Sequence, residues 1–369
     1  MTTSALLSRK DLRLFSLCAV AVVGGAITRY VPSGRVVPFV VSAVALALLA
    51  SLVGRAVEAL GDRLGAGATG VVQSALGNLP ELFVCIFALR AGLYDVVRAA
   101  LVGSVLANVL LVLGLAFVVG GLRHGTQKFS ATAARTISVL LMLSVFAWMI
   151  PSLTAALHSP AESHERALSV VTSIMLLLLF ALSLPAATAR SHEAHGATEG
   201  HAEADAEVAT GAGGGAGEWP MAMAIGVLAI AGVGAAVVSD WFVVALEPAM
   251  DAVGLSQAFA GLVVVAIAGN AVENVVGIQL AARNQADYAL SVILQSPVQI
   301  ALVVAPVLVL IAPLVGATFT LVISPLMVVA LFMAAVIAVL IVMDGESNWL
   351  EGATLIVLYL LIAASVWWG

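Results

Sequence analysis

Long runs of apolar residues follow one another along most of this 369-residue chain, separated by short polar stretches. Each run has about 20 residues or more, which is enough for a helix to cross the hydrocarbon core of a bilayer. The runs are continuously apolar instead of alternating, so they favour helices over the strands of a barrel. The pattern predicts eleven membrane spans, at residues 11–31, 36–62, 67–91, 95–121, 130–156, 164–188, 219–253, 257–283, 286–312, 317–342 and 348–368.

Composition supports this interpretation. Hydrophobic residues make up 62% of the chain and charged residues 10%, whereas the surface of a soluble protein needs many more charges. We therefore expect an all-α polytopic membrane protein. As a separate expectation, we place it in the inner membrane of a bacterial cell. Most lysines and arginines fall on the cytoplasmic side if the N-terminus is cytoplasmic, which predicts that orientation.

An internal repeat relates the two halves of the chain, and its matching residues are polar. The pentad Gly77–Glu81 reads Gly-Asn-Leu-Pro-Glu, and Gly269–Glu273, 192 residues later, reads Gly-Asn-Ala-Val-Glu. The pentads and a second pair of matching segments both indicate the same duplication, so chance is a poor explanation. The other matching pairs are Asp95 with Asp287 and Ser104 with Ser296 at the same offset, and segment 58–65 with segment 247–254 at an offset of 189.

The repeat predicts the organisation of the chain. Residues 1–31 form a first helix, and residues 36–188 and 219–369 form two five-helix repeats. An odd number of helices per repeat inverts the second repeat in the membrane, and a substrate site then forms near the midplane, at the repeat interface. Residues 189–218 are rich in acidic residues, His and Gly, and we interpret them as a cytoplasmic tether that either is simply solvated or binds a cation loosely or senses pH.

The two pentad glutamates are the leading candidates for chemistry. A carboxylate at the centre of a membrane helix costs roughly 2.5–3.5 kcal/mol, so Glu81 and Glu273 must be protonated, paired or bound to a cation. The alternative is a pair of neutral glutamic acids, each bonded to a neighbouring helix. Gly77 and Gly269 loosen the helix before each glutamate, which frees backbone carbonyls for a cation.

Neutral oxygen ligands accompany the glutamates. For any one of them, ordinary hydrogen bonding between helices is the competing interpretation. As a set they describe a site for a hard cation, and Ca²⁺ fits best because it takes six to eight oxygens and two carboxylates balance its charge. Two protons would balance that charge equally well, which predicts exchange of Ca²⁺ for protons. These residues are Asn78, Asn270, Ser104, Asn108, Ser296 and Gln299.

These motifs together resemble the calcium/cation antiporter superfamily, specifically its calcium/proton exchanger (CAX) branch. The resemblance runs from about residue 45 to the C-terminus, and its motifs are both pentads, Gly61–Gly65, Phe87–Gly92, Gln299–Leu302 and Gly345–Gly352. It implies that Glu81 and Glu273 are the central cation ligands, completed by the six neutral residues above. It also implies that the helices bearing Glu58 and Glu247 belong to a moving, gating bundle. Four acidic residues on these helices then either line polar access paths or lie at solvated helix ends: Glu58, Asp62, Glu247 and Asp251.

Two departures from the family pattern leave the counter-ion open. The first repeat has Leu79-Pro80 before its glutamate where the family has Ala-Thr, and this Pro-Glu pair resembles sodium/calcium exchangers. The second repeat has Asn274 where the family has a histidine. The alternatives are therefore exchange of Ca²⁺ for Na⁺ or another monovalent cation and, less favoured, a cation channel.

An enzyme is the weakest interpretation, because the sequence offers no nucleophile–base pair. The expected partners are Ca²⁺, protons and the lipid bilayer, with no cofactor and no nucleic acid. The sequence is compatible with an oligomer but does not indicate one.

Overall fold

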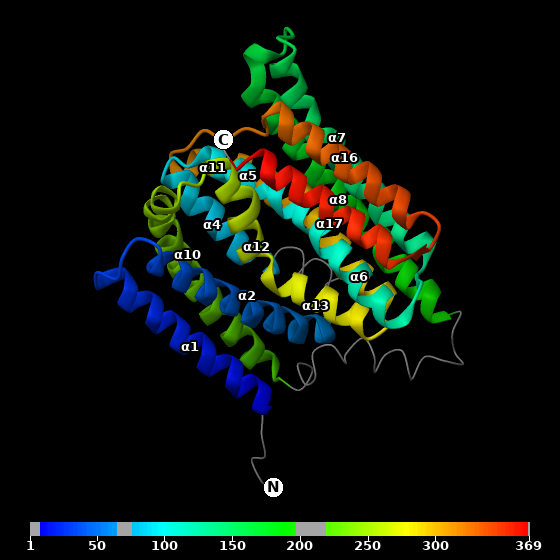
Figure 1. Ribbon diagram of the computed structural model, residues 1–369, viewed down its shortest axis with the longest axis horizontal. Helices are drawn as coiled ribbons and strands as arrows, with labels where there is room; N and C mark the ends of the chain where they lie inside the picture. The colour runs from blue at the N-terminus through cyan, green and yellow to red at the C-terminus, as the bar shows by residue number, and fades with distance from the viewer. Residues whose placement is uncertain (1–7, 65–75, 197–218, 368–369) are drawn as a thin grey trace. The chain divides into compact units, whose positions relative to one another are not determined.

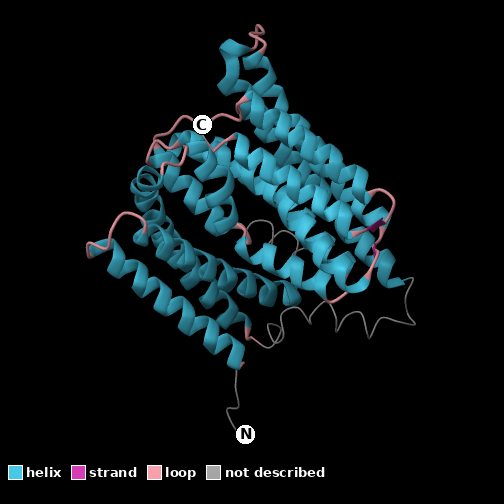
Figure 2. Cartoon of the chain, viewed as in Figure 1, coloured by secondary structure: helices cyan, strands magenta, loops and turns pink. Residues whose placement is uncertain are grey.

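A computed structural model describes residues 8–64, 76–196 and 219–367 of the chain. Within these ranges the chain is almost entirely helical (Figure 2). Among the described residues, eight helices are long and apolar enough to cross a membrane, or nine when a pair bent by 64° at residues 257–282 is counted as one span. The two strands of the described ranges, β1 (Gln127–Lys128) and β2 (Glu346–Ser347), form one short antiparallel ribbon.

The chain divides into two compact units, which are described separately. Unit 1 comprises Met1–Phe87 and Leu179–Ala252, and unit 2 comprises Ala88–Leu178 and Val253–Gly369. Unit 1 contains α1 (Arg9–Tyr30), α2 (Val37–Leu64), the beginning of α4 (Leu79–Arg90), the end of α8 (Glu165–Gly196) and α10 (Met221–Val253).

Aromatic and small residues pack the helices of unit 1 together. Phe39 of α2 lies against Phe242 of α10, with ring centroids 4.8 Å apart. Trp241 of α10 lies close to Gly25 of α1, where any larger side chain would approach the indole. Helices α1 and α2 run side by side along most of their length (Figure 1).

A buried ion pair joins α1 to α2 at the beginning of α1. Asp11 is 1% exposed and lies 2.7 Å from Nη2 of Arg55, which is 18% exposed. The same carboxylate accepts hydrogen bonds from the backbone and hydroxyl of Ser8, in a capping box that begins α1, and from the indole of Trp219. Arg55 lies within α2, and the Asp11 carboxylate balances its charge.

Unit 2 is a tightly packed group of helices, several of which contain a wide π turn. Within it, α6 (Leu113–His124) and α17 (Trp349–Ser365) pack side by side (Figure 1). Its elements in chain order are α5 (Tyr94–Leu106), η1 (Ala107–Val112), α6 (Leu113–His124), α7 (Ala131–Ala156), η2 (Glu162–His164), the beginning of α8, α11 (Gln257–Phe259), η4 (Ala260–Val265), α12 (Ala266–Gly269), α13 (Ala271–Ala282), α14 (Ala286–Gln299), η5 (Ile300–Val304), α15 (Ala305–Ile311), η6 (Ala312–Val315), α16 (Pro325–Val342) and α17 (Trp349–Ser365).

The predicted tenth span, 317–342, was wrong at its beginning, because α16 starts only at Pro325. Proline is favoured in the first turn of a helix and keeps the preceding residue extended, and the Ser324 side chain caps this start by accepting from the amide of Met327. Residues 317–324 are not helical, and Ala317, Phe319, Leu321 and Ile323 alternate as buried positions. That two-residue period is a strand-like signal that was visible in the sequence.

Serine side chains from two helices satisfy the backbone of this extended segment. Ser169 of α8 accepts a hydrogen bond from the amide of Leu321 at 3.1 Å. Ser152 of α7 accepts from the amide of Ile323 at 3.0 Å and donates to the carbonyl of Leu321. Backbone groups outside a helix need such partners in a membrane protein, so these two serines make the extended segment possible.

Candidate functional site

Each pentad places its glutamate in the first turn of a described helix. In unit 1 the chain turns at Gly77 and Asn78, and α4 begins at Leu79, so Glu81 is its third residue. In unit 2, α12 ends at Gly269 and α13 begins at Ala271, so Glu273 is likewise the third residue of a new helix. The free amides at a helix N-terminus favour negative charge there. Each pentad thus places a carboxylate where the backbone itself offers some compensation.

Four polar side chains form a buried hydrogen-bonded network in unit 2, and they come from both sequence repeats. The Nδ2 of Asn270 donates to the hydroxyl of Ser104 at 2.9 Å and to the carbonyl of Ala266 at 3.0 Å. The hydroxyl of Ser296 donates to Oδ1 of Asn270 at 3.1 Å. The Nδ2 of Asn108 donates to the carbonyl of Ser104 at 2.8 Å and contacts the hydroxyl of Ser296 at 3.5 Å. The structure therefore brings together Ser104, Asn108, Asn270 and Ser296.

The network is shielded from solvent and still has an oxygen to offer. Ser104 and Asn108 are 0% exposed, Asn270 is 1% exposed and Ser296 is 4% exposed. Within the described part of the chain, Oδ1 of Asn108 is buried and has no hydrogen-bond partner. A buried acceptor without a donor is costly, and a cation is one group that would satisfy it.

Two glycines allow the helices that carry the network to approach closely. A Cβ on Gly103 of α5 would collide with the backbone of Leu262 in η4. A Cβ on Gly261 of η4 would collide with the carbonyl of Val96 in α5. This mutual contact brings Ser104 of α5 within hydrogen-bond distance of Asn270, the residue that follows α12. Neither glycine stood out in the sequence, because the requirement arises from a neighbour more than 150 residues away.

Wide π turns lie next to the network on three helices. Asn108 lies within η1, η5 begins directly after Gln299, and η4 precedes α12. In η1, the amide of Leu113 reaches back to the carbonyl of Asn108, five residues earlier, instead of four. Single π turns inside α-helices occur frequently at functional sites, because they free or redirect backbone groups.

The other predicted site residues occupy different environments. Glu81 and Asn78 are buried in unit 1, with 3% and 7% exposed. Glu273 is half-buried in α13, and Gln299 is 7% exposed at the end of α14. Of the residues predicted to form access paths, Glu58 is half-buried in α2, Glu247 and Asp251 are exposed on α10, and the side chain of Asp62 lies outside the described residues.

One residue next to the second pentad adds to the site. Asn274 directly follows Glu273 in α13, and its amide donates to the carbonyl of Asn270 at 3.1 Å. Its side-chain Oδ1 is buried without a hydrogen-bond partner among the described residues. It thus supplies a second unsatisfied amide oxygen close in sequence to the candidate carboxylate.

Comparisons with known proteins place the chain in a family. Residues 35–188 and 223–368 match the family described as sodium/calcium exchanger protein. This chain belongs to that family. It is therefore a multi-pass membrane protein of a transporter family, and not an enzyme.

Similar proteins within this family are named for calcium transport. A Ca²⁺/H⁺ antiporter of Synechocystis sp. is 33% identical over 340 residues, which cover 89% of this chain and 90% of that protein. A vacuolar calcium ion transporter of Schizosaccharomyces pombe is 30% identical over 366 residues, covering 98% of this chain and 85% of that protein. The solved structure of native YfkE is 33% identical, covers 96% of this chain and 99% of its own, and superimposes with a TM-score of 0.78.

Proposed function

We propose that this protein exchanges Ca²⁺ for protons across a membrane by alternating access, with Glu81 and Glu273 as the site that both ions share. The observation that carries the proposal is the buried network of neutral oxygens contributed by both repeats. The Ca²⁺/H⁺ antiporter name of the Synechocystis relative, at 33% identity over most of both chains, supports the choice of ions.

The donor set suits Ca²⁺ better than a softer metal. Ca²⁺ takes six to eight oxygens in flexible geometry, and carboxylates and amide carbonyls are its usual ligands. In this proposal Glu81 and Glu273 supply the charge and Oδ1 of Asn108 supplies a neutral ligand. The hydroxyls of Ser104 and Ser296, with Asn78, Asn270 and Gln299, complete the coordination or hold the ligands in place.

Charge balance at the two glutamates couples the movement of Ca²⁺ to the movement of protons. A site with two ionised glutamates in hydrocarbon surroundings is costly, so the protein changes its access only when that charge is cancelled. One Ca²⁺ cancels it, and so do protons bound to the carboxylates. The two ions therefore compete for the same oxygens and move in opposite directions. The helices carrying Glu58 and Glu247 would open and close the site, with Asp62 and Asp251 at polar access paths.

Sodium is the second candidate for the counter-ion. Pro80 before the first glutamate, and Asn274 in place of a titratable histidine, are the residues that favour it. We propose a location in a bacterial inner membrane with the N-terminus in the cytoplasm. Vacuolar relatives such as the S. pombe transporter make an internal membrane the alternative.

Purified protein in proteoliposomes separates these functions. We expect an imposed pH gradient, acidic inside, to drive uptake of radioactive Ca²⁺, and an imposed Na⁺ gradient at equal pH to drive none. Calcium uptake driven by Na⁺ alone would identify the sodium exchanger instead. Calcium flux that continues without any counter-ion would identify a channel.

Replacing Asn108 with leucine tests the neutral oxygens. The change removes the unpaired Oδ1 and the donor to Ser104, so we expect the KM for Ca²⁺ to rise roughly 10-fold, as is common when a group supporting a metal site is lost. The matched control is Ser144→Ala, because Ser144 is equally buried and donates to the carbonyl of Leu141 within its own helix. An unchanged KM in Asn108→Leu would remove Asn108 from the site.

A further inference from the structure

The π turn that follows Gln299 takes from the carbonyl of Ala301 the amide that serves it in a regular helix. In η5 the amide of Ala305 bonds to the carbonyl of Ile300, five residues earlier. In a regular helix that amide would have served the carbonyl of Ala301. The next candidate for Ala301 is residue 306, which is a proline and has no N–H. Neither the amide four residues after Ala301 nor the position five residues after it therefore serves the Ala301 carbonyl.

The indole of Trp148 supplies the missing donor. Its Nε1 donates to the carbonyl of Ala301 at 3.2 Å, from α7, a helix 153 residues earlier in the chain. Trp148 is 2% exposed, and the bond is buried. Unpaired backbone carbonyls are rare in protein interiors. The indole N–H of Trp148 is therefore the group that satisfies the Ala301 carbonyl beside the π turn.

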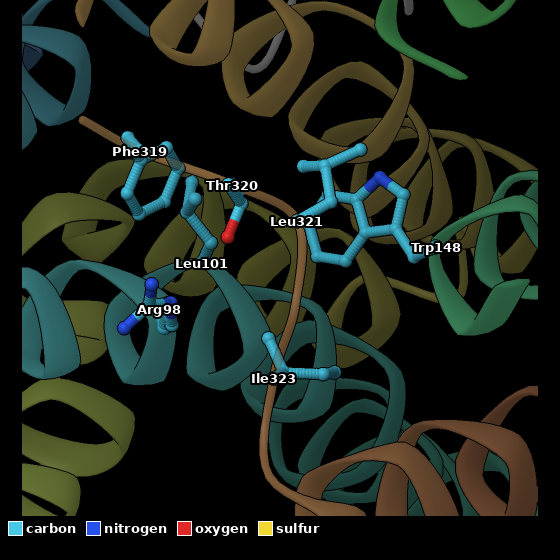
Figure 3. Close-up of a pocket in the computed structure, with 7 residues that line it drawn as sticks. All are labelled: Arg98, Leu101, Trp148, Phe319, Thr320, Leu321 and Ile323. Atoms are coloured by element: carbon cyan, nitrogen blue, oxygen red, sulfur yellow. The ribbon is translucent and has the colours of Figure 1, made fainter. Parts of the chain in front are cut away.

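The other side of the indole closes a small recess. Trp148 lines this recess with Leu321 and Ile323 of the extended segment and with Arg98 and Leu101 of α5 (Figure 3). In Figure 3 the indole nitrogen lies on the side of the ring away from Arg98. Trp148 thus has two separable contributions: apolar packing in the recess and a hydrogen bond to η5.

We propose that Trp148 is a positioning residue for calcium binding, which acts by fixing the π turn that orients Ser296 and Gln299. These two residues lie in the last turn of α14, directly before η5. The hydroxyl of Ser296 donates to Asn270, so a rotation of this turn would shift the buried network. The inference rests on the proposed function, because it assigns Ser296 and Gln299 to the calcium site.

An isosteric replacement separates the hydrogen bond from packing. In Trp148→β-(3-benzothienyl)alanine a sulfur replaces the indole N–H while the ring keeps its size. We expect the Kd for Ca²⁺, measured by equilibrium binding of radioactive Ca²⁺ to purified protein, to rise about 3- to 10-fold, which corresponds to one buried hydrogen bond. Trp148→4-fluorotryptophan, which keeps the N–H, should bind like the wild type. The control Tyr359→Phe removes a buried hydroxyl that has no hydrogen-bond partner in the described ranges, and its affinity should not change.

A second substitution restores the donor by another route. Pro306→Ala provides an amide at position 306 that can serve the carbonyl of Ala301 in a π turn. In that background the effect of the benzothienyl replacement should shrink, a coupling that packing alone would not produce. Wild-type affinity in the benzothienyl variant, or an undiminished effect in the Pro306→Ala background, would overturn the role of Trp148. Absence of calcium binding by the wild type would overturn the proposed function itself, and this inference with it.

Discussion

Glu81→Gln and Glu273→Gln should each lower calcium exchange by about 100-fold or more, because each carboxylate supplies half of the charge that balances Ca²⁺. Glutamine keeps the size and the hydrogen-bonding shape of glutamate but carries no charge and binds no exchangeable proton. Both glutamates are the third residue of a helix, a position that glutamine also accepts, so the fold should persist. The measurement is Ca²⁺ uptake by proteoliposomes under a pH gradient, normalised to the amount of inserted protein.

Glu162→Gln is the control for this pair. Glu162 lies in η2 and pairs with His158 at the surface, and it belongs to no part of the proposed site. Its variant should transport like the wild type. The thermal unfolding midpoint of each variant shows that lost transport is not lost folding. Normal exchange in either Glu81→Gln or Glu273→Gln would contradict the shared-site mechanism.

Gly103→Ala should also remove transport, through packing instead of charge. The added methyl group meets three backbone atoms of Leu262, which cannot move aside as a flexible side chain would. The helices must separate, and the bond between Ser104 and Asn270 is then lost. We expect destabilisation of about 1–3 kcal/mol or more, typical of an overpacked interior, together with loss of most calcium uptake.

The same substitution at Gly226 is the matched control. Gly226 is in α10, and a Cβ there meets nothing within 4 Å. Gly226→Ala should therefore leave uptake intact and stabilise its helix slightly, since alanine is the better helix former. The comparison uses calcium uptake and thermal unfolding of the two purified variants. Equal behaviour of Gly103→Ala and Gly226→Ala would show that close approach at Leu262 is unimportant.

The membrane pattern was predictable because hydrophobic length alone largely determines it. The repeat was predictable for another reason: the polar pentads stand out against apolar surroundings, so Asn78, Glu81, Asn270 and Glu273 were found without structural information. The family match covers residues 35–188 and 223–368, which include both pentads. The roles of the individual site residues stay predictions.

Features that depend on distant partners could not be predicted in the same way. The extended segment before α16 shows a local two-residue period, but the bonds from Ser152 and Ser169 that satisfy its backbone come from distant helices and have no local signal. The π turns follow no hydrophobic period, although Pro306 in an apolar run is a local sign that a helix carbonyl will lack its donor. Trp148 lies 153 residues from Ala301, the carbonyl that it satisfies. Such residues emerge only once the fold brings them together.

Proton release on calcium binding tests the central claim most directly. Ca²⁺ is titrated into weakly buffered purified protein over a range of starting pH, and the released protons are counted against the bound calcium. We expect the wild type to release protons as Ca²⁺ binds, and the Glu81→Gln/Glu273→Gln double variant to bind no Ca²⁺ and release none. Calcium binding by the wild type without proton release at any pH, or unchanged release in the double variant, would contradict the claim that the two glutamates hold Ca²⁺ and protons in turn.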